Sequence, residues 1–94
     1  MARASWNGAL IAESDRFELV EGNVYFPRAA VKPEYLREAS KTTVCGWKGT
    51  ARYHDVVVDG KVNAGAAWYY PEPKDAAANI RDHIAFWQGV TVEK

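Results

Sequence analysis

The segment Thr-Ala-Arg-Tyr-His-Asp-Val-Val-Val-Asp-Gly, residues 50–60, indicates the fold class of this 94-residue chain. β-Branched and aromatic residues are frequent in it, and this composition predicts a strand. Tyr53 would lie on one face, whereas Val56 and Val58 would lie on the other, so both faces are partly apolar. Asp59-Gly60 is a turn pair that tolerates positive φ at both positions. The segment therefore predicts a strand that ends in a tight hairpin.

Similar short runs lie on both sides of this hairpin. They are rich in apolar, β-branched or aromatic residues, and Gly, Asn, Asp or Pro separates them, as expected for strands joined by tight turns. The runs are residues 9–13, 17–21, 24–26, 62–70 and 84–92, the last of which we expect to form one closing strand bent at Gly89. We expect the pair Gly22-Asn23 to form the turn between the second and third runs. The whole chain thus predicts roughly six to eight short strands.

Two further segments predict helices. Pro33 suits the first helical position, and the residues after it favour a helix of about two turns over residues 33–39. Asp75 is an expected N-cap for a second helix over residues 76–80. Strands outnumber helices and do not alternate with them, which argues against a parallel α/β sheet. We therefore expect a single domain over residues 1–94, mainly β and antiparallel, curled or partly closed like a barrel, with two short helices.

Charge and composition exclude several functional classes. The chain has 12 Lys and Arg and 12 Asp and Glu, and it has no basic stripe of the kind that binds phosphate backbones, so nucleic acid is not an expected partner. Zero net charge favours self-association into a homo-oligomer. No segment approaches the roughly 20 apolar residues of a membrane span, so no membrane partner is expected. The single cysteine excludes an intramolecular disulfide, and we expect a cytoplasmic protein.

The segment Cys45-Gly46-Trp47-Lys48-Gly49 carries residues suited to chemistry. Cys45 is the candidate catalytic residue, for thiol redox or acyl chemistry, and would need a nearby His, cation or helix N-terminus to lower its pKa. The alternative is a small buried hydrophobe, which is the role of most lone cysteines. Lys48 between Trp47 and Gly49 suggests contact with an anionic ligand, because glycines let a ligand approach the backbone and lysine binds phosphate or carboxylate. The alternative is a turn with a solvated lysine.

The tryptophans and the histidines are further candidates, for a binding pocket and for a metal site respectively. The four tryptophans lie in separate segments and either fill the core or converge at one opening; they are Trp6, Trp47, Trp68 and Trp87. Cys45, His54 and His83 supply three potential zinc ligands, but no two of them have the short spacing of a zinc site. We therefore expect no metal and no cofactor.

A series of motifs extends from Trp6 to Val92. It comprises Trp6-Asn7-Gly8, Ala12-Glu13-Ser14, Gly22-Asn23-Val24-Tyr25-Phe26-Pro27, Thr43 to Tyr53, Ala66-Ala67-Trp68-Tyr69-Tyr70-Pro71-Glu72-Pro73 and Ile84-Ala85-Phe86-Trp87. In this order the motifs resemble domain-of-unknown-function family 427, a group of short, mostly bacterial proteins. One departure is Gly46, which stands where the family segment commonly has proline.

The resemblance implies a β-tent fold, in which two small antiparallel sheets meet at an angle. That fold is similar to methionine-sulfoxide reductases of the B type and to the ligand-binding domain of cereblon. Members often carry zinc on two Cys pairs, which this chain lacks. Other members bind ligands in an aromatic cage or use a catalytic cysteine, and both roles reach this chain by fold analogy alone. The nucleotidyltransferase-like name of the family finds no support, because the chain has no acidic metal-binding pair in a Gly-Ser context.

We therefore expect a binding module rather than an enzyme. Its partner would be a small molecule, anionic or aromatic, bound by Trp47, Lys48, Trp68 and Tyr69. One alternative is an enzyme that uses Cys45. A second alternative is a non-catalytic interaction or assembly domain, which the zero net charge favours.

Overall fold

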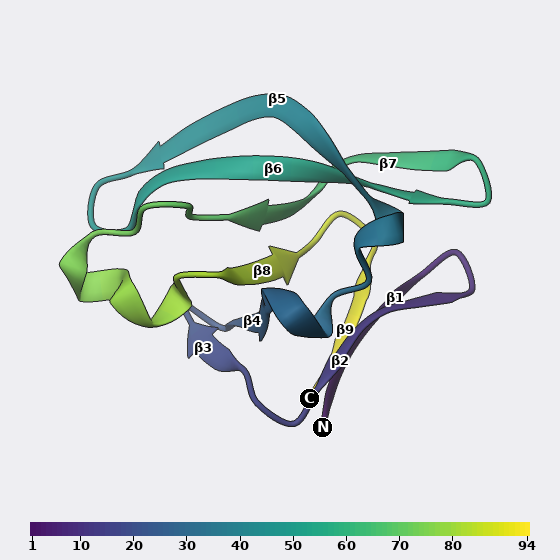
Figure 1. The fold of residues 1–94 in the computed structure, drawn as a ribbon, viewed down its shortest axis with the longest axis horizontal. Coiled ribbons are helices and arrows are strands. Elements are labelled where there is room, and N and C mark those ends of the chain that lie inside the picture. The colour runs from purple at the N-terminus through teal and green to yellow at the C-terminus, as the bar shows by residue number, and fades with distance from the viewer.

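The computed structural model describes residues 1–94 and contains nine strands in two antiparallel sheets (Figure 1). The larger sheet has the strand order β3-β4-β8-β7-β6-β5 and the smaller has the order β2-β1-β9. The strands are β1 (Ala2–Trp6), β2 (Ala9–Ser14), β3 (Glu18–Val20), β4 (Asn23–Pro27), β5 (Leu36–Cys45), β6 (Gly49–Val58), β7 (Lys61–Tyr69), β8 (His83–Phe86) and β9 (Thr91–Glu93). Short 3-10 helices occur at η1 (Arg28–Ala30), η2 (Pro33–Tyr35) and η3 (Asp75–Ile80). The predicted mainly β, antiparallel architecture is confirmed.

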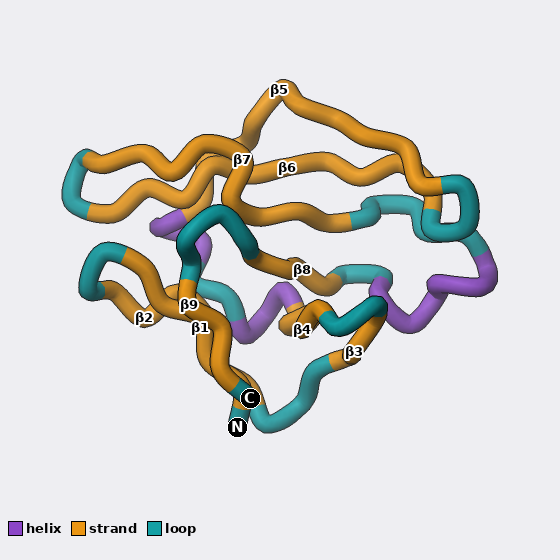
Figure 2. Tube along the Cα trace, turned by 180° about the vertical axis from the view of Figure 1, so that it is seen from behind, coloured by secondary structure: helices purple, strands orange, loops and turns teal.

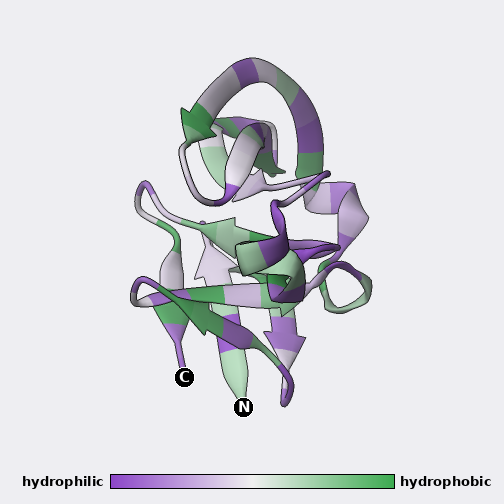
Figure 3. Ribbon diagram, turned by 90° about the vertical axis from the view of Figure 1, so that its left-hand side faces the viewer, coloured by the Kyte–Doolittle hydropathy of each residue, from purple (hydrophilic) through white to green (hydrophobic).

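The smaller sheet brings the two ends of the chain together. Strand β1 lies between β2 and β9, and Arg3 pairs with Glu93. Figure 2 shows both termini at the same end of the molecule, away from the long hairpin of β5 and β6. Strand β5 is the outer edge of the larger sheet, and it arches away from the body with mostly hydrophilic residues along it (Figure 3).

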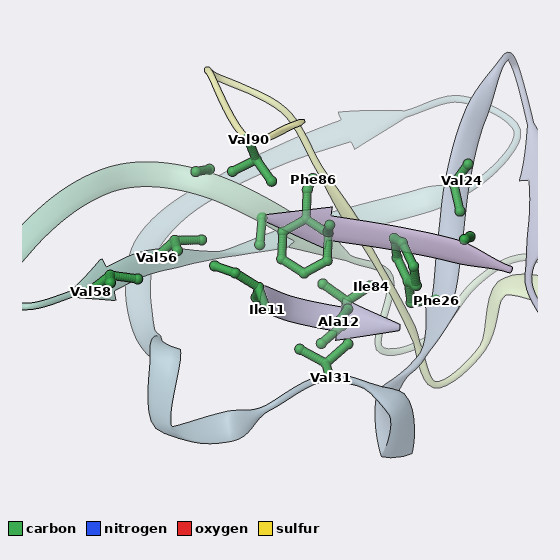
Figure 4. Close-up of a cluster of buried hydrophobic side chains, with 14 residues drawn as sticks. Ile11, Ala12, Val24, Phe26, Val31, Val56, Val58, Ile84, Phe86 and Val90 are labelled. Atoms are coloured by element: carbon green, nitrogen blue, oxygen red, sulfur yellow. The ribbon is translucent and has the colours of Figure 1, made fainter. Parts of the chain in front are cut away.

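Two hydrophobic clusters stabilise this arrangement. The first contains aliphatic side chains and phenylalanines from both sheets, and Figure 4 shows Phe86 among them; its larger members are Ile11, Val24, Phe26, Val31, Val56, Val58, Ile84, Phe86 and Val90. The second has a different composition, with three tyrosines among its members; these members are Tyr25, Ala51, Tyr53, Tyr70, Ala77, Ile80 and Ala85. Half-buried Trp68 and Cys45 pack against this second cluster.

Strand β6 contributes to both clusters because alternate residues of a strand point to opposite faces of the sheet. A bulge also interrupts its pairing with β7. The register passes from His54↔Ala67 to Val56↔Asn63, so Asp55 alone faces three residues of β7. Before the bulge, Tyr53 lies in the second cluster; after it, Val56 lies in the first.

The carboxylate of Asp55 stabilises this bulge. Its Oδ1 accepts the backbone N–H of Gly65 at 2.9 Å, and its Oδ2 accepts a guanidinium N–H of Arg37 at 2.8 Å. The Arg37 guanidinium, followed by the Gly65 N–H, holds the pKa of Asp55 below its ordinary value. Both oxygens of a nearly buried carboxylate are therefore satisfied, as burial requires.

Four expectations about the elements need correction. The helix over residues 33–39 is wrong beyond its first turn, because Leu36 pairs with Val56 and the chain continues as β5. Sheet pairing here outweighs intrinsic helix propensity. The single closing strand is also wrong: Gln88 and Gly89 both have positive φ, and the turn separates β8 in one sheet from β9 in the other.

The other two corrections are smaller. The first turn of the larger sheet is Glu21-Gly22, with φ of 55° and 79°, rather than Gly22-Asn23. The helix expected near Asp75 exists as η3, but it begins at Asp75 itself and Lys74 holds the cap position without a side-chain hydrogen bond. Strand β1 was not anticipated from the sequence.

Candidate functional site

One pocket lies on the face of the larger sheet that carries the tyrosine-rich cluster. It has a volume of about 240 Å³, and four of its six lining residues are aromatic; the six are Asn23, Lys48, Tyr53, Trp68, Tyr70 and Trp87. Strand pairing explains how they meet. Tyr53 of β6 pairs with Trp68 of β7, and Trp68 pairs with Ala85 of β8, so these side chains share one face.

The aromatic rings of the pocket are held in fixed orientations. The ring centroids of Trp68 and Trp87 are 5.7 Å apart and the planes meet at 73°, an edge-to-face contact. The indole Nε1–H of Trp68 donates to the Tyr25 hydroxyl at 3.0 Å. The indole Nε1–H of Trp87 donates to the Gly65 carbonyl at 2.7 Å. Because both indole donors are already satisfied, the two tryptophans offer a ligand mainly ring surface.

The loop from Gly46 to Lys48 delivers the charged group of the pocket. Cys45 pairs with Gly49 at the base of this β5–β6 hairpin. The backbone N–H of Lys74 donates to the Lys48 carbonyl at 3.0 Å, and the Lys74 ammonium donates to the Gly46 carbonyl at 2.8 Å. The loop is therefore fixed from outside the hairpin.

Gly49 is required where this loop rejoins the sheet. Its φ is 114°, and a Cβ placed on it would lie 3.2 Å from the carbonyl oxygen of Glu72. Only glycine adopts this conformation readily and leaves room for the neighbouring backbone. This close approach packs the loop against the segment after β7, and so places Lys48 beside Tyr70.

Lys48 is buried, with 6% of its surface exposed. Its ammonium forms an ion pair with the Glu21 carboxylate and lies 5.3 Å from the ring centroid of Trp47 and 5.6 Å from that of Tyr70. Glu21 reaches it from the turn between β3 and β4, where the positive φ of Glu21 forms a tight hairpin. Two hairpins that are distant in sequence thus meet at this ion pair.

The surrounding groups keep Lys48 charged. Burial lowers the pKa of Lys48, but the hydrogen bond to Glu21 and the phenol oxygens of Tyr25 and Tyr70 together raise it by more. The pKa of Lys48 therefore lies above its ordinary value, while the same hydrogen bond lowers the pKa of Glu21. Burial raises the pKa of Tyr70. At neutral pH the pocket wall contains an ammonium and a neutral phenol.

Of the four residues expected to bind a ligand, two line the pocket and two do not. Lys48 and Trp68 line the pocket. Trp47 does not line it and is 41% exposed, although its ring covers the Lys48 ammonium. Tyr69 follows Trp68 in β7 and therefore points to the opposite face, where it stacks on His54 at 4.7 Å. Ligand binding by any of them remains a prediction.

Sequence reasoning did not single out Asn23, Tyr53 and Tyr70, and it named Trp87 only among all the tryptophans. The signal for Tyr70 is its spacing of two residues from Trp68, which places both on one face if the extended backbone continues. The signal for Tyr53 is its pairing with Trp68, which requires the β6–β7 register and hence the bulge at Asp55.

Cys45 is a half-buried free thiol that packs against the tyrosine-rich cluster. His54, which folding could have placed near it, instead stacks on Tyr69, and its Nδ1 lies 3.4 Å from the Glu38 carboxylate. No group of three or more His, Cys, Asp or Glu side chains is placed to hold a metal ion. None of the helices has the length and apolar character needed to cross a membrane.

Comparison with known families places the whole chain in one of them. The model described as "Domain of unknown function (DUF427)" matches residues 1–94, which confirms the resemblance seen in the order of motifs. No curated protein matches the chain.

Proposed function

Because the chain belongs to the DUF427 family, a domain of unknown function, we propose its function from the pocket: it is a module that binds a small aromatic or anionic molecule. The observation that carries the proposal is the buried ammonium of Lys48 in the wall of an aromatic pocket. Small-molecule sites typically combine aromatic walls with a few placed polar groups.

Lys48 would supply the polar contact. Burying an ammonium is costly unless it is paired, and Glu21 provides that pairing. An ammonium has three N–H donors, so its contact with Glu21 leaves it able to donate to an oxygen of a ligand. Because its pKa is raised, Lys48 is protonated at neutral pH and serves as a cationic donor rather than as a general base.

The aromatic walls set the size of the ligand. Pockets that enclose drug-sized molecules occupy roughly 300–1,000 Å³, and this pocket is smaller, at about 240 Å³. One planar ring system with a short polar substituent fits that volume. The ring would lie against Trp68 and Trp87, and the substituent would reach Lys48 and Asn23.

The enzyme and assembly alternatives have no comparable observation in their favour. The thiol of Cys45 packs against the tyrosine-rich cluster and does not line the pocket. A small molecule is therefore the partner we propose, with no role for nucleic acid or membranes, and we place the binding in the cytoplasm.

The four tryptophans provide an internal test. We expect titration of the ¹⁵N-labelled protein with indole-3-carboxylate to shift the indole N–H signals of Trp68 and Trp87 in a saturable manner. The signal of Trp6, which lies in another strand and does not line the pocket, serves as the control and should move little. Equal shifts at all four tryptophans, or shifts that never saturate, would contradict binding in the pocket.

A further inference from the structure

A second lysine lies against the aromatic pocket without a charged partner. The β5–β6 register passes from Glu38↔His54 to Thr42↔Arg52, so Tyr53 alone faces a bulge of three β5 residues. Lys41 is the last residue of this bulge. Its ammonium lies 4.7 Å from the ring centroid of Tyr53 and 5.4 Å from that of Trp87, both lining residues of the pocket.

The environment of Lys41 differs from that of Lys48. The ammonium of Lys48 is buried and paired with Glu21. The side chain of Lys41 is exposed, and it forms neither an ion pair nor a hydrogen bond. Glu21 is the partner of Lys48, so the positive charge of Lys41 beside Tyr53 is not balanced by an ion pair.

The position of Lys41 is partly fixed before any ligand arrives. Its Cδ packs near Gly65 of β7, 3.9 Å from the point where a Cβ would lie on that glycine. Two ring faces attract the ammonium at the other end of the side chain. A lysine already held in place loses less side-chain freedom when it pairs with an anion.

We propose that Lys41 selects the charge of the ligand, so that the pocket takes a planar ring that carries an anionic group. This inference rests on the proposed binding function and specifies its ligand class. The ring lies against Trp68 and Trp87, and its anionic substituent is attracted both by the paired ammonium of Lys48 and by the unpaired ammonium of Lys41. A cationic ligand would meet the unbalanced positive charge and compete with Lys41 for the same ring faces. A neutral ring would gain no ion pair.

Three probes of nearly equal shape test this selection: indole-3-carboxylate, neutral indole-3-carboxamide and cationic indole-3-methylammonium. Affinities come from the Trp68 and Trp87 indole signals at low and at high salt. We expect the wild type to bind the carboxylate about three- to fivefold more tightly than the carboxamide, as for a partly exposed ion pair. We expect the cation to bind most weakly, and the carboxylate preference to shrink at high salt.

Matched variants assign the preference to one side chain. Lys41→Gln should abolish the preference for carboxylate while leaving affinity for the carboxamide unchanged, and Lys41→Arg should retain it. Lys61→Gln removes the same charge from an exposed position at the start of β7 and should keep the preference. Equal binding of carboxylate and carboxamide by the wild type, or an unchanged preference in Lys41→Gln, would overturn the role of Lys41 while the pocket function stands. Failure of all three probes to shift the pocket signals would overturn the pocket function itself.

Discussion

The two halves of strand β6 serve two regions with different chemistry. Val56 and Val58 lie in the cluster between the sheets, whose members are hydrocarbon side chains. Ala51 and Tyr53 lie in the other cluster, which contains three tyrosines and borders the pocket. Apolar burial needs only close packing, whereas each buried hydroxyl also needs a hydrogen-bond partner. The first region therefore stabilises the fold, and the second region positions polar groups around the pocket.

Removing side-chain volume from the first region should have the largest effect on stability. Ile11 is fully buried between the sheets, so Ile11→Ala loses apolar burial and leaves a cavity. We expect a loss of about 2–4 kcal/mol in the free energy of unfolding, measured by urea denaturation. Leu19→Ala, at a side chain that is 52% exposed, is the control and should change stability by less than about 0.5 kcal/mol. Similar losses from both variants would contradict the division between the regions.

Backbone strain where the pocket loop rejoins the sheet should have the second largest effect on stability. Gly49→Ala forces a Cβ toward the Glu72 carbonyl at a φ of 114°, and we expect a loss of about 1–3 kcal/mol. Gly46→Ala lies in the same loop, has open space around the added Cβ and does not have a positive φ, so it should be nearly neutral. If both glycines tolerate alanine equally in thermal unfolding, Gly49 does not fix the loop.

A single hydroxyl of the second region should have a smaller effect. The Tyr53 hydroxyl shares a hydrogen bond of 2.9 Å with the Thr43 hydroxyl, which Tyr53→Phe removes while keeping the ring. We expect a loss of about 1 kcal/mol, close to the net value of one hydrogen bond. Tyr35→Phe, at a half-buried tyrosine that packs against the first region, serves as the control and should be silent in the same urea titration.

The smallest effect should be a pH dependence at the boundary between the regions. Burial lowers the pKa of His54, although the Glu38 carboxylate opposes this shift. The unfolded chain therefore binds a proton more readily, so stability is full above the ordinary histidine pKa of about 6.5 and falls as pH drops through it. Unfolding curves between pH 8 and pH 5 should show this slope in the wild type and in His83→Asn. The slope should be absent in His54→Asn, and its persistence there would contradict the assignment.

Local signals in the sequence predicted the hairpins. Pairing between residues far apart in the sequence determines the other elements, and local signals do not reveal it. Asp59 and Gly60 adopt positive φ as expected, because the two residues themselves determine that turn. The helix expected after Pro33 fails at Leu36, because pairing with Val56 cannot be seen from neighbouring residues. Strand β1 has the sequence Ala-Arg-Ala-Ser-Trp, which has little strand propensity and depends on its partners on both sides.

The candidate site shows the same limit. Lys48 was identified from the glycines around it, because that signal is local. The choice between Trp68 and Tyr69 depends on which face of β7 borders the pocket, and that is the face that Trp68 shares with its partner Tyr53. The partner of Lys48 was beyond sequence reasoning, because Glu21 lies 27 residues away in another hairpin.

The pairing of β1 with β9 also has a topological consequence. Because Arg3 lies opposite Glu93, a linker of a few residues would join the two ends into a circle. New ends could then be opened at the exposed Asp59-Gly60 turn, which lies outside the pocket. In such a circular permutant β7 would come first and β6 last, with the neighbours of every strand in both sheets unchanged. The strand pairing of the fold therefore does not depend on where along the chain the two ends are placed.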